Sequence, residues 1–352
     1  MAKRKSFLGI DIGHYYTKIV DIEEKDNIRF LNSAIKERTP DVLFTDENID
    51  EDILKEFIKD IVSTHKIKNK KTAIALNSSV VIVKMLDMPL VDAKEMKQSV
   101  MWEAEQYIPF NLDTVNVSYQ IMKKDEDAKE MQVLIAAVKK DKINSYVNAI
   151  KNAGLQVLVA DVDVFSEANI FYSNNENVVN DSNLIIDVGY DATKMLFMQG
   201  EIPAFSRYVD FGFKTITDNI SRNLEISFDK ANGMMNNVNN LSEDLKIRVL
   251  SIVRDEMQNL YDETRNSITF YRTNVKSAVS DSIKRIILSG AAGCLIDYIK
   301  EDFLSSVGDI KNIVSINPFQ LLTAQSGDFD LNDISDGAAL YSAATGLAMR
   351  GL

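Results

Sequence analysis

The chain has 352 residues, of which 45% are hydrophobic and 26% charged, with only 5 prolines, a balance typical of a folded protein long enough for two lobes. The formal net charge of -12 argues against binding to nucleic acid or to an anionic membrane surface. A single cysteine, Cys294, and two histidines exclude an internal disulfide and a His-rich metal site, and no run of about 18 uncharged apolar residues offers direct membrane insertion, so we expect a cytoplasmic protein.

The first part of the sequence predicts alternating strands and helices. Residues 5–35 predict a meander of three short strands, because their apolar residues are bounded by Gly, Asp and Asn. A helix is predicted over 50–65 and a β-rich run over 72–85. Asp92 is predicted to cap a helix that runs to about Tyr107. Two strands and a second helix then complete a compact αββα insertion, at 115–122, 131–138 and 141–153.

Further elements are predicted in the second half of the chain. An apolar run at 155–164 leads into a helix. A polar loop at 175–183 then precedes another strong strand, which is followed by a turn and a further strand within 184–202. One long helix is predicted from Ser242 to about Thr273, because apolar residues recur along one face of it. The closing residues predict a small-residue-rich helix that can approach another backbone closely.

A sequence repeat relates the two halves. The stretch DIGHYYTK, Asp11 to Lys18, aligns with DVGYDATK, Asp187 to Lys194, and each follows one apolar run and precedes another. Such a repeat predicts a duplicated β-hairpin core in two lobes that face each other. A third turn, within 286–293, follows a strand pattern and opens a helix, which is the geometry that presents backbone N–H groups to an anion.

These three turns predict a nucleotide site. Glycines and short polar residues at a hairpin turn let backbone N–H groups converge on a phosphate. Asp11 and Asp187 would hold the waters of a hydrated Mg²⁺, and the third turn would hold the adenosine. Each aspartate could equally be an ordinary turn residue that accepts local N–H bonds. The candidate residues for binding ATP or ADP with Mg²⁺ are Asp11, Gly13, His14, Tyr15, Tyr16, Thr17, Lys18, Asp187, Gly189, Tyr190, Asp191, Thr193, Gly290, Ala291 and Ala292.

Several stretches resemble a known family. The most specific is MWEAEQYIPFNLDTVNVSYQI at 101–121, supported by VADVDVFSEANIF at 159–171, RDEMQNLYDETRNSITFYRTN at 254–274, NPFQ at 317–320 and GLAMRG at 346–351. Over essentially its full length the chain resembles the actin/Hsp70/FtsA superfamily and, within it, the PilM family of type IV pilus assembly.

The resemblance implies a fold and a role. The fold is an actin-like two-lobed α/β fold with a duplicated β-hairpin core and an inserted αββα subdomain. The role is that of an ATP-binding scaffold, peripheral at the inner membrane, that recruits the cytoplasmic N-terminal segment of a bitopic PilN-like membrane protein beneath the pilus motor platform. A homo-oligomer or ring is compatible with this role.

The chain departs from the family pattern at the site. His14, Tyr15 and Tyr16 stand where the family carries small hydroxyl residues, so their bulk either narrows the phosphate pocket or leaves the backbone donors usable. The family's Ala-Glu-x-x-Lys is replaced by a stretch that offers Asn232 and Met235, and the usual paired glycines of the adenosine turn read Gly-Ala-Ala-Gly. We therefore expect at most a weak ATPase, with no residue assigned to catalysis.

Other residues keep a structural alternative. Glu167 is the nearest candidate for a catalytic base, but we expect a surface acid on a helix. Trp102 is expected in the core of the insertion, although its helix can also form one wall of a partner groove. The hairpin residues have similar alternatives. Thr17 and Thr193 are as readily strand residues as ligands. Lys18 and Lys194 could contact phosphate, but we expect strand lysines that face water.

The expected division of the chain follows the repeat. The first lobe core is 1–88 with a return at 159–182, and the inserted small subdomain, which forms the partner groove wall, is 89–158. The second lobe core is 183–222 and 275–330, and the small subdomain of this lobe is 223–274. The C-terminal helix at 331–352 returns to the first lobe.

Two other functions are compatible with this fold. One is a sugar or small-acid kinase. The other is an FtsA-like filament former, although the closing residues are too weakly amphipathic for a membrane anchor.

Overall fold

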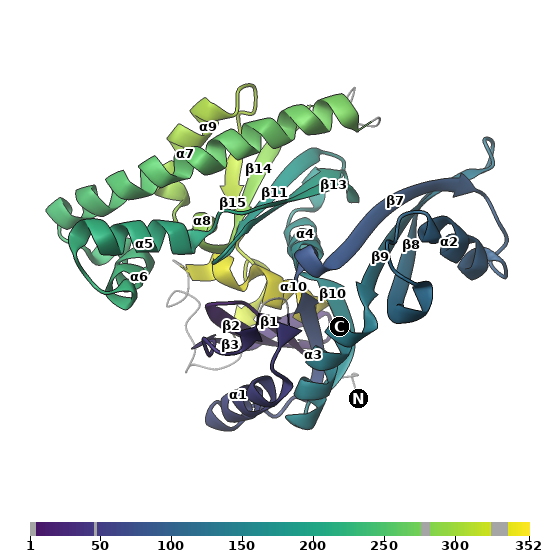
Figure 1. Ribbon diagram of the computed structural model, residues 1–352, viewed down its shortest axis with the longest axis horizontal. Coiled ribbons are helices and arrows are strands. Elements are labelled where there is room, and N and C mark those ends of the chain that lie inside the picture. The colour runs from purple at the N-terminus through teal and green to yellow at the C-terminus, as the bar shows by residue number, and fades with distance from the viewer. Residues whose placement is uncertain (1–4, 46–47, 276–281, 325–336) are drawn as a thin grey trace.

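Two β-sheets with two helices between them form the centre of the molecule (Figure 1). The computed structural model describes residues 5–45, 48–275, 282–324 and 337–352. The first sheet has the strand order β10-β6-β1-β2-β3-β16, with bounds β1 (Lys5–Ile12), β2 (Tyr16–Lys25), β3 (Ile28–Arg38), β6 (Lys71–Leu76), β10 (Gln156–Val162) and β16 (Thr323–Ala324). The second has the order β13-β12-β11-β14-β15, with bounds β11 (Ser182–Val188), β12 (Thr193–Gln199), β13 (Ile202–Val209), β14 (Arg285–Ser289) and β15 (Ile313–Ser315). The predicted meander of 5–35 is confirmed as β1, β2 and β3.

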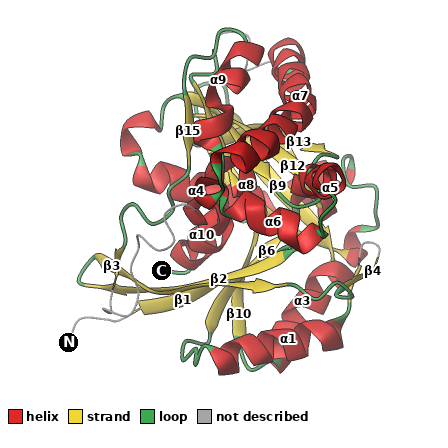
Figure 2. Cartoon of the chain, turned by 90° about the vertical axis from the view of Figure 1, so that its left-hand side faces the viewer, coloured by secondary structure: helices red, strands yellow, loops and turns green. Residues whose placement is uncertain are grey.

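Helices cover both faces of each sheet (Figure 2). Between the sheets lie α4 (Asp163–Asn174), packed on the second sheet, and α10 (Ser342–Arg350), packed on the first. The other face of the first sheet is covered by α1 (Glu51–Thr64) and α3 (Lys140–Asn152). The other face of the second sheet carries α5 (Phe213–Leu224), α6 (Phe228–Asn236), α7 (Glu243–Asn274) and α9 (Ile296–Ser306). The short α8 (Gly290–Cys294) follows β14 directly, and β4 (Phe44–Thr45) pairs with β5 (Asn48–Ile49).

The central layer depends on two glycines. A Cβ at Gly9 of β1 would overlap the carbonyl oxygen of Ala344 in α10, and a Cβ at Gly346 would overlap the carbonyl oxygen of Ser166 in α4. Close backbone approach of this kind is possible only without a side chain. The small residues at the end of the sequence therefore let α10 fit between β1 and α4, as the sequence predicts.

A third sheet stands away from the two lobes (Figure 1). Its order is β7-β9-β8, with β7 (Val81–Pro89), β8 (Val115–Asp125) and β9 (Glu130–Lys139), and α2 (Met96–Glu105) packs on it. The β-rich run predicted over 72–85 is thus two strands in different sheets, separated by a short 3-10 turn at Ser78–Val80. Because β7 pairs with β9, this sheet begins before residue 89, where the inserted subdomain was predicted to start.

Two helix predictions have different outcomes. The long helix predicted from Ser242 is confirmed as α7, with Ser242 as its N-cap. The predicted start of α2 at Asp92 is wrong, because α2 begins at Met96 and the backbone carbonyl of Asp92 instead accepts the N–H of Glu95 in a preceding turn. Within the described ranges, no helix combines the length and the apolar composition needed to cross a membrane.

Candidate functional site

The two repeated turns lie at equivalent ends of their hairpins. In the first, Asp11 on β1 is paired in register with Lys18 on β2, and the N–H of Gly13 donates to the carbonyl of Tyr16 at 3.2 Å. In the second, Asp187 on β11 is paired with Lys194 on β12. The Gly189 N–H there donates to the Ala192 carbonyl at 2.9 Å. The sequence repeat therefore corresponds to a structural repeat, down to the hydrogen bond that closes each turn.

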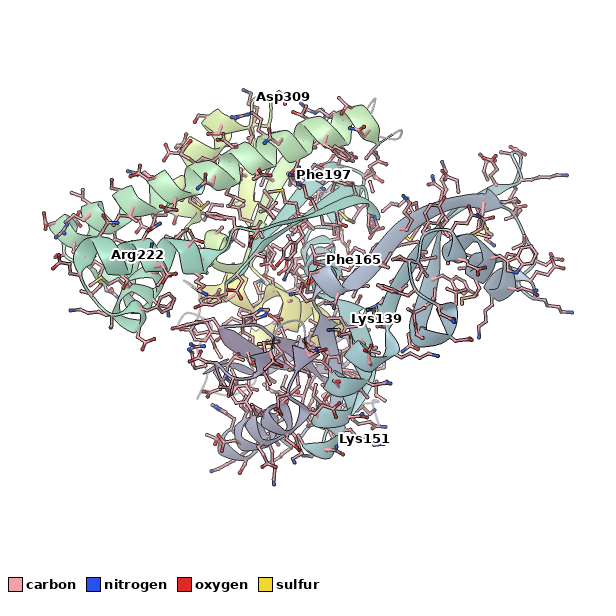
Figure 3. All side chains as sticks on the ribbon, in the orientation of Figure 1. Lys139, Lys151, Phe165, Phe197, Arg222 and Asp309 are labelled. Carbon is pink, nitrogen blue, oxygen red and sulfur yellow. The ribbon has the colours of Figure 1, made fainter. Side chains whose placement is uncertain are left out.

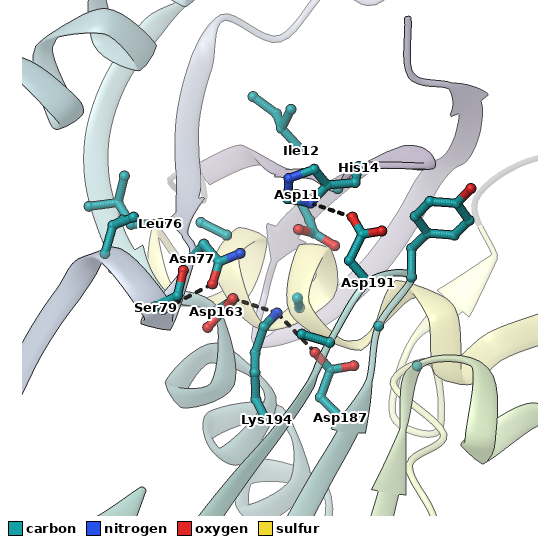
Figure 4. Close-up of a pocket in the computed structure, with 18 of the residues that line it drawn as sticks. Asp11, Ile12, His14, Leu76, Asn77, Ser79, Asp163, Asp187, Asp191 and Lys194 are labelled. Carbon is teal, nitrogen blue, oxygen red and sulfur yellow. Dashed lines mark hydrogen bonds and ion pairs between the residues drawn. The ribbon is translucent and has the colours of Figure 1, made fainter. Parts of the chain in front are cut away.

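A cavity of about 770 Å³ separates the two turns, and Figure 4 shows residues that line it. Its volume lies within the usual range of pockets for small ligands. Most of the predicted site residues line it, namely Asp11, Gly13, His14, Tyr15, Tyr16, Lys18, Asp187, Gly189, Tyr190, Asp191, Gly290 and Ala291. The other three, Thr17, Thr193 and Ala292, do not line it and are buried.

The two threonines have structural partners instead. The hydroxyl of Thr17 lies 2.9 Å from the hydroxyl of Thr39, and that of Thr193 donates to the carbonyl of Phe211 at 2.8 Å. The first of these contacts joins β2 to the residue that follows β3, and the second joins β12 to the segment that follows β13. The threonines thus keep the shape of the turns rather than facing the cavity.

Gly290, in the third turn, is required by the backbone. It has a φ of +62°, and a Cβ there would lie 2.5 Å from the Asp187 Oδ1 atom and 2.5 Å from the Val188 carbonyl oxygen. Only glycine adopts this conformation without strain. The turn therefore passes directly beside the Asp187 carboxylate.

The floor of the cavity holds paired charges. The Nζ atom of Lys18 lies 2.6 Å from an oxygen of Asp11, and the Nζ atom of Lys194 lies 2.7 Å from Asp163 and 3.2 Å from Asp187 (Figure 4). The expectation that these two lysines face water is wrong, since each side chain is 15% exposed. Asp163, the first residue of α4, was missed because only the packing of α4 between the sheets brings it to the hairpin.

Glu167 lies beside these charges. The expectation of a surface acid is wrong, because Glu167 is 3% exposed and lines the cavity. Its Oε1 atom accepts the hydroxyl of Ser289 at 2.9 Å, and its Oε2 atom is buried without a hydrogen-bond partner. Burial, together with the nearby carboxylate of Asp187, raises the pKa of Glu167 well above its ordinary value. The surroundings of Glu167 therefore favour its protonated form.

The two tyrosines of the first turn make contacts across the cleft. The ring of Tyr15 stacks on the ring of Tyr190 with centroids 4.7 Å apart, and the guanidinium carbon of Arg38 lies 3.8 Å from the Tyr15 centroid. The hydroxyl of Tyr16 accepts a hydrogen bond from the side chain of Asn232 at 3.1 Å. Burial and the Asp191 carboxylate raise the pKa of Tyr190 to about 12. The bulky residues that depart from the family pattern thus join the two lobes at the mouth of the cavity.

His14 belongs to the same contact. Its Nδ1 atom lies 3.4 Å from a carboxylate oxygen of Asp191, and its ring lies 4.1 Å from that of Phe44, measured between centroids. Burial lowers the pKa of His14 although Asp191 opposes the shift. The contact of His14 with Asp191 of the second lobe is one that the sequence did not indicate.

The other wall of the cavity comes from segments that the sequence did not single out. Asn77, Lys139, Lys142 and Tyr146 line it. Lys139 is the last residue of β9 and Lys142 lies in the first turn of α3, so the junction of this strand and helix carries positive charge toward the cavity (Figure 3 labels Lys139). The cluster of lysines was a usable signal, because cations grouped in the wall of a cavity favour an anionic ligand.

The cavity as it stands does not fit a divalent metal ion. One carboxylate oxygen of Asp11 lies 2.6 Å from the Nζ atom of Lys18, and one of Asp187 accepts a hydrogen bond from Lys194. Within the described part of the chain, no three His, Cys, Asp or Glu side chains are arranged to hold a metal ion. We therefore assign no chemistry to a metal here.

Comparisons with known proteins agree with this architecture. Residues 9–352 match the family model of the type IV pilus assembly protein PilM. The chain is similar to a solved PilM-PilN type IV pilus biogenesis complex, with 23% identity, 98% of each chain covered and a TM-score of 0.82. It is also similar to the ethanolamine utilization protein EutJ of Carboxydothermus hydrogenoformans, with 11% identity, coverage of 98% and 89%, and a TM-score of 0.58. MreB5 of Spiroplasma citri bound to ADP gives 12% identity, coverage of 97% and 94%, and a TM-score of 0.54.

These likenesses show the fold. The predicted actin-like two-lobed α/β fold is confirmed, and the kinase and filament alternatives are not favoured, because the family match spans nearly the whole sequence. The chain belongs to the type IV pilus assembly protein PilM family.

Proposed function

We propose that this protein is an actin-like adaptor of a type IV pilus assembly machine, peripheral at the inner membrane. In this proposal it binds ATP or ADP between its lobes and holds the cytoplasmic N-terminal segment of a PilN-like membrane protein on its inserted subdomain. Membership of the PilM family carries the proposal, and the likeness to a PilM-PilN complex supports the choice of partner. In the wider assembly that we propose, the protein lies beneath the pilus motor platform and forms a homo-oligomer or ring.

The nucleotide part rests on the interlobe cavity. The two facing turns bring Gly13, Gly189 and Lys18 to the cavity, and Gly290 and Ala291 offer a close backbone approach at the third turn. Lys139 and Lys142 add positive charge along the opposite wall. A polyphosphate tail between the turns and an adenosine beside the third turn would use these features. At most weak ATP hydrolysis is the expected activity, because no residue is assigned to catalysis.

The partner part rests on exposed aromatic residues of the inserted subdomain. Helix α2 packs on the inserted sheet through Met96, Val100 and Ala104. Trp102 lies off that face and is 73% exposed, so the expectation of a core position for it is wrong. Exposed aromatic rings are frequent anchors for a bound segment. The same subdomain also carries the exposed aromatic residues Tyr107, Phe110 and Tyr119.

The two parts are physically connected. Pro109 and Phe110, which follow α2, line the interlobe cavity. The ring of Phe110 lies 4.2 Å from the Nζ atom of Lys139, measured to its centroid, and Lys139 lines the same cavity. A ligand that contacts both lobes favours one lobe arrangement over another. Nucleotide is therefore proposed to change the affinity for the partner segment through this wall.

The chain's single tryptophan provides the test. Because Trp102 is the only one, its fluorescence reports directly on a peptide that docks beside α2. We expect titration with a peptide copying the N-terminus of the PilN-like protein to change this fluorescence. Calorimetry should show about tenfold or greater loss of affinity for Trp102→Ala. Ile247→Ala, at an exposed position of α7, is the matched control. Full affinity in Trp102→Ala would place the partner elsewhere, and absence of binding by the folded wild type would refute the partner proposal.

A further inference from the structure

Lys194 lies at the meeting point of both lobes and the central helix layer. Its ammonium group contacts Asp187 of β11 and Asp163 of α4, and the side chains of these two aspartates are 11% and 6% exposed. Figure 4 shows the ammonium group between the two carboxylates. The aspartate in the turn of the first lobe, Asp11, adds to the negative potential at this position. One buried cation therefore pairs with carboxylates from a strand and from the central helix layer.

The second hairpin uses its lysine differently from the first. In the first, Lys18 pairs with Asp11, its partner in register. In the second, Lys194 pairs with its own register partner Asp187 and in addition reaches Asp163. Burial alone would lower the pKa of Lys194, but the carboxylates of Asp163 and Asp187 raise it well above its ordinary value. The ammonium form is thus the one that the site stabilises.

The position of this ammonium group conflicts with a bound divalent cation. Mg²⁺ requires oxygen ligands or ordered waters at about 2.1 Å in near-ideal octahedral geometry. The Asp187 Oδ2 atom accepts from Lys194, and its Oδ1 atom lies against the third turn at Gly290. A metal ion here would have to displace a buried ammonium group and leave it without its partners, which is strongly unfavourable.

The same ammonium group is suited to bind phosphate. An ammonium group has three N–H donors, and the two aspartates take two of them. The third can reach a ligand in the cavity, because Lys194 lines it. Lys18, paired with Asp11, is a second cation at the equivalent position of the first hairpin, so each of the two turns presents one ammonium group to the cavity beside its carboxylate.

We propose that Lys194 takes the place of the divalent cation, so that the cavity binds a nucleoside diphosphate or triphosphate as the free anion, without Mg²⁺. This inference rests on the proposed nucleotide binding and adds its metal requirement. The consequence is a resident nucleotide that acts as a structural ligand, since the metal that would neutralise charge during phosphoryl transfer has no position beside Asp187 and Asp163.

Calorimetric titration of the nucleotide-free wild type tests this directly. ADP and ATP are each titrated once with EDTA and once with excess Mg²⁺. We expect equal affinity in both, or weaker apparent affinity with Mg²⁺, because Mg²⁺ competes with the protein for the phosphates. Binding at least tenfold tighter with Mg²⁺ would overturn the inference but leave nucleotide binding intact. No binding under either condition, by folded protein, would overturn both.

Variants of Lys194 add a second measurement. Lys194→Met removes the cation and frees two carboxylates, so we expect Mg²⁺ to improve its nucleotide affinity tenfold or more. Lys18→Met is the matched control, which should weaken binding equally with EDTA and with Mg²⁺. If Lys194→Met does not fold, two other measurements test the inference. One is nucleotide binding by Lys194→Arg, and the other is titration of the wild-type protein with Mn²⁺ alone, followed by electron paramagnetic resonance. The arginine variant should keep binding in EDTA, and Mn²⁺ binding by the nucleotide-free wild type would contradict the inference.

Discussion

Tyr15 and Tyr190 stack on each other across the cleft, with ring centroids 4.7 Å apart and an angle of 28° between the rings. They occupy the turns of the two repeated hairpins, so one sequence repeat contacts its own copy. Asp229 and Phe228 of α6 extend the contact: the Tyr15 hydroxyl lies 3.4 Å from a carboxylate oxygen of Asp229, and the Phe228 ring is 5.9 Å from that of Tyr15. This contact links the two lobes beside the cavity.

The stacked pair should be energetically coupled. We expect a double-mutant cycle of Tyr15→Ala and Tyr190→Ala to give an interaction free energy of about 0.5–1.5 kcal/mol, because stacked aromatic rings contribute this much beyond their buried area. The measurement is the free energy of unfolding of the four proteins by urea denaturation.

A second cycle serves as its control. Tyr119 is exposed on the inserted sheet, so Tyr119→Ala combined with Tyr15→Ala should be additive within about 0.3–0.5 kcal/mol. Additivity in the Tyr15 and Tyr190 cycle as well would mean that the stack does not hold the lobes together.

Glu167 should make stability depend on pH. Its pKa is raised in the folded protein by burial and by Asp187, so the folded state keeps a proton that the unfolded state releases. The contribution is fully present below the ordinary glutamate value of 4.5 and is lost as the pH rises toward the folded pKa. Glu167→Gln, which resembles the protonated acid, should therefore melt at a higher temperature than the wild type at pH 8, by about 2 °C or more.

The comparison at low pH provides the check. Below the ordinary glutamate pKa the acid is protonated in both states, so the difference between Glu167→Gln and the wild type should shrink as the pH falls from 8. A variant less stable than the wild type at pH 8 would indicate that the carboxylate form is the one stabilised by Ser289.

The glycine between α10 and α4 should not tolerate a side chain. A Cβ at Gly346 would overlap the carbonyl of Ser166, so Gly346→Ala must push the two helices apart. We expect a loss of about 1–3 kcal/mol in the free energy of unfolding, or no folded protein, as for other overpacked cores.

Gly233 offers the matched substitution. It lies within α6, and a Cβ there meets nothing within 4 Å. Gly233→Ala should therefore gain about 0.5–1 kcal/mol, because alanine reduces the backbone entropy lost on folding. Equal effects of the two substitutions would show that α10 and α4 are less closely packed than described.

The local features of the fold could be predicted from the sequence. The repeat of Asp11 and Asp187 with their glycines gave both hairpins and their facing turns, because turn chemistry and strand alternation are local signals. Helix α7 was equally clear from its apolar face. The exposure of Trp102 also had a local signal that we did not use: the buried residues of α2 recur every four residues at Met96, Val100 and Ala104, and Trp102 falls on the opposite side.

The charged floor of the cavity could not be predicted in the same way. Glu167 and Asp163 are buried because α4 lies between two sheets, which no local pattern reveals. Lys194 reads as a strand lysine until the strand and the helix are brought together. The contact of Tyr15 with Tyr190 similarly needs the relative placement of two lobes. These residues depend on contacts between segments far apart in the sequence, and a single sequence carries little information on such contacts.

The position of α10 also determines the order in which this chain can fold during synthesis. The second sheet, β11 to β15, is built from one continuous stretch, so its strands can pair as soon as Ser315 has left the ribosome. The core of the first sheet needs a later segment, because Ala344 and Ala348 of α10 cover Val20 and Ile22 and are synthesised after all the strands of this sheet. The strands synthesised first thus complete their core last, and their apolar surface needs protection, such as a chaperone provides, until then.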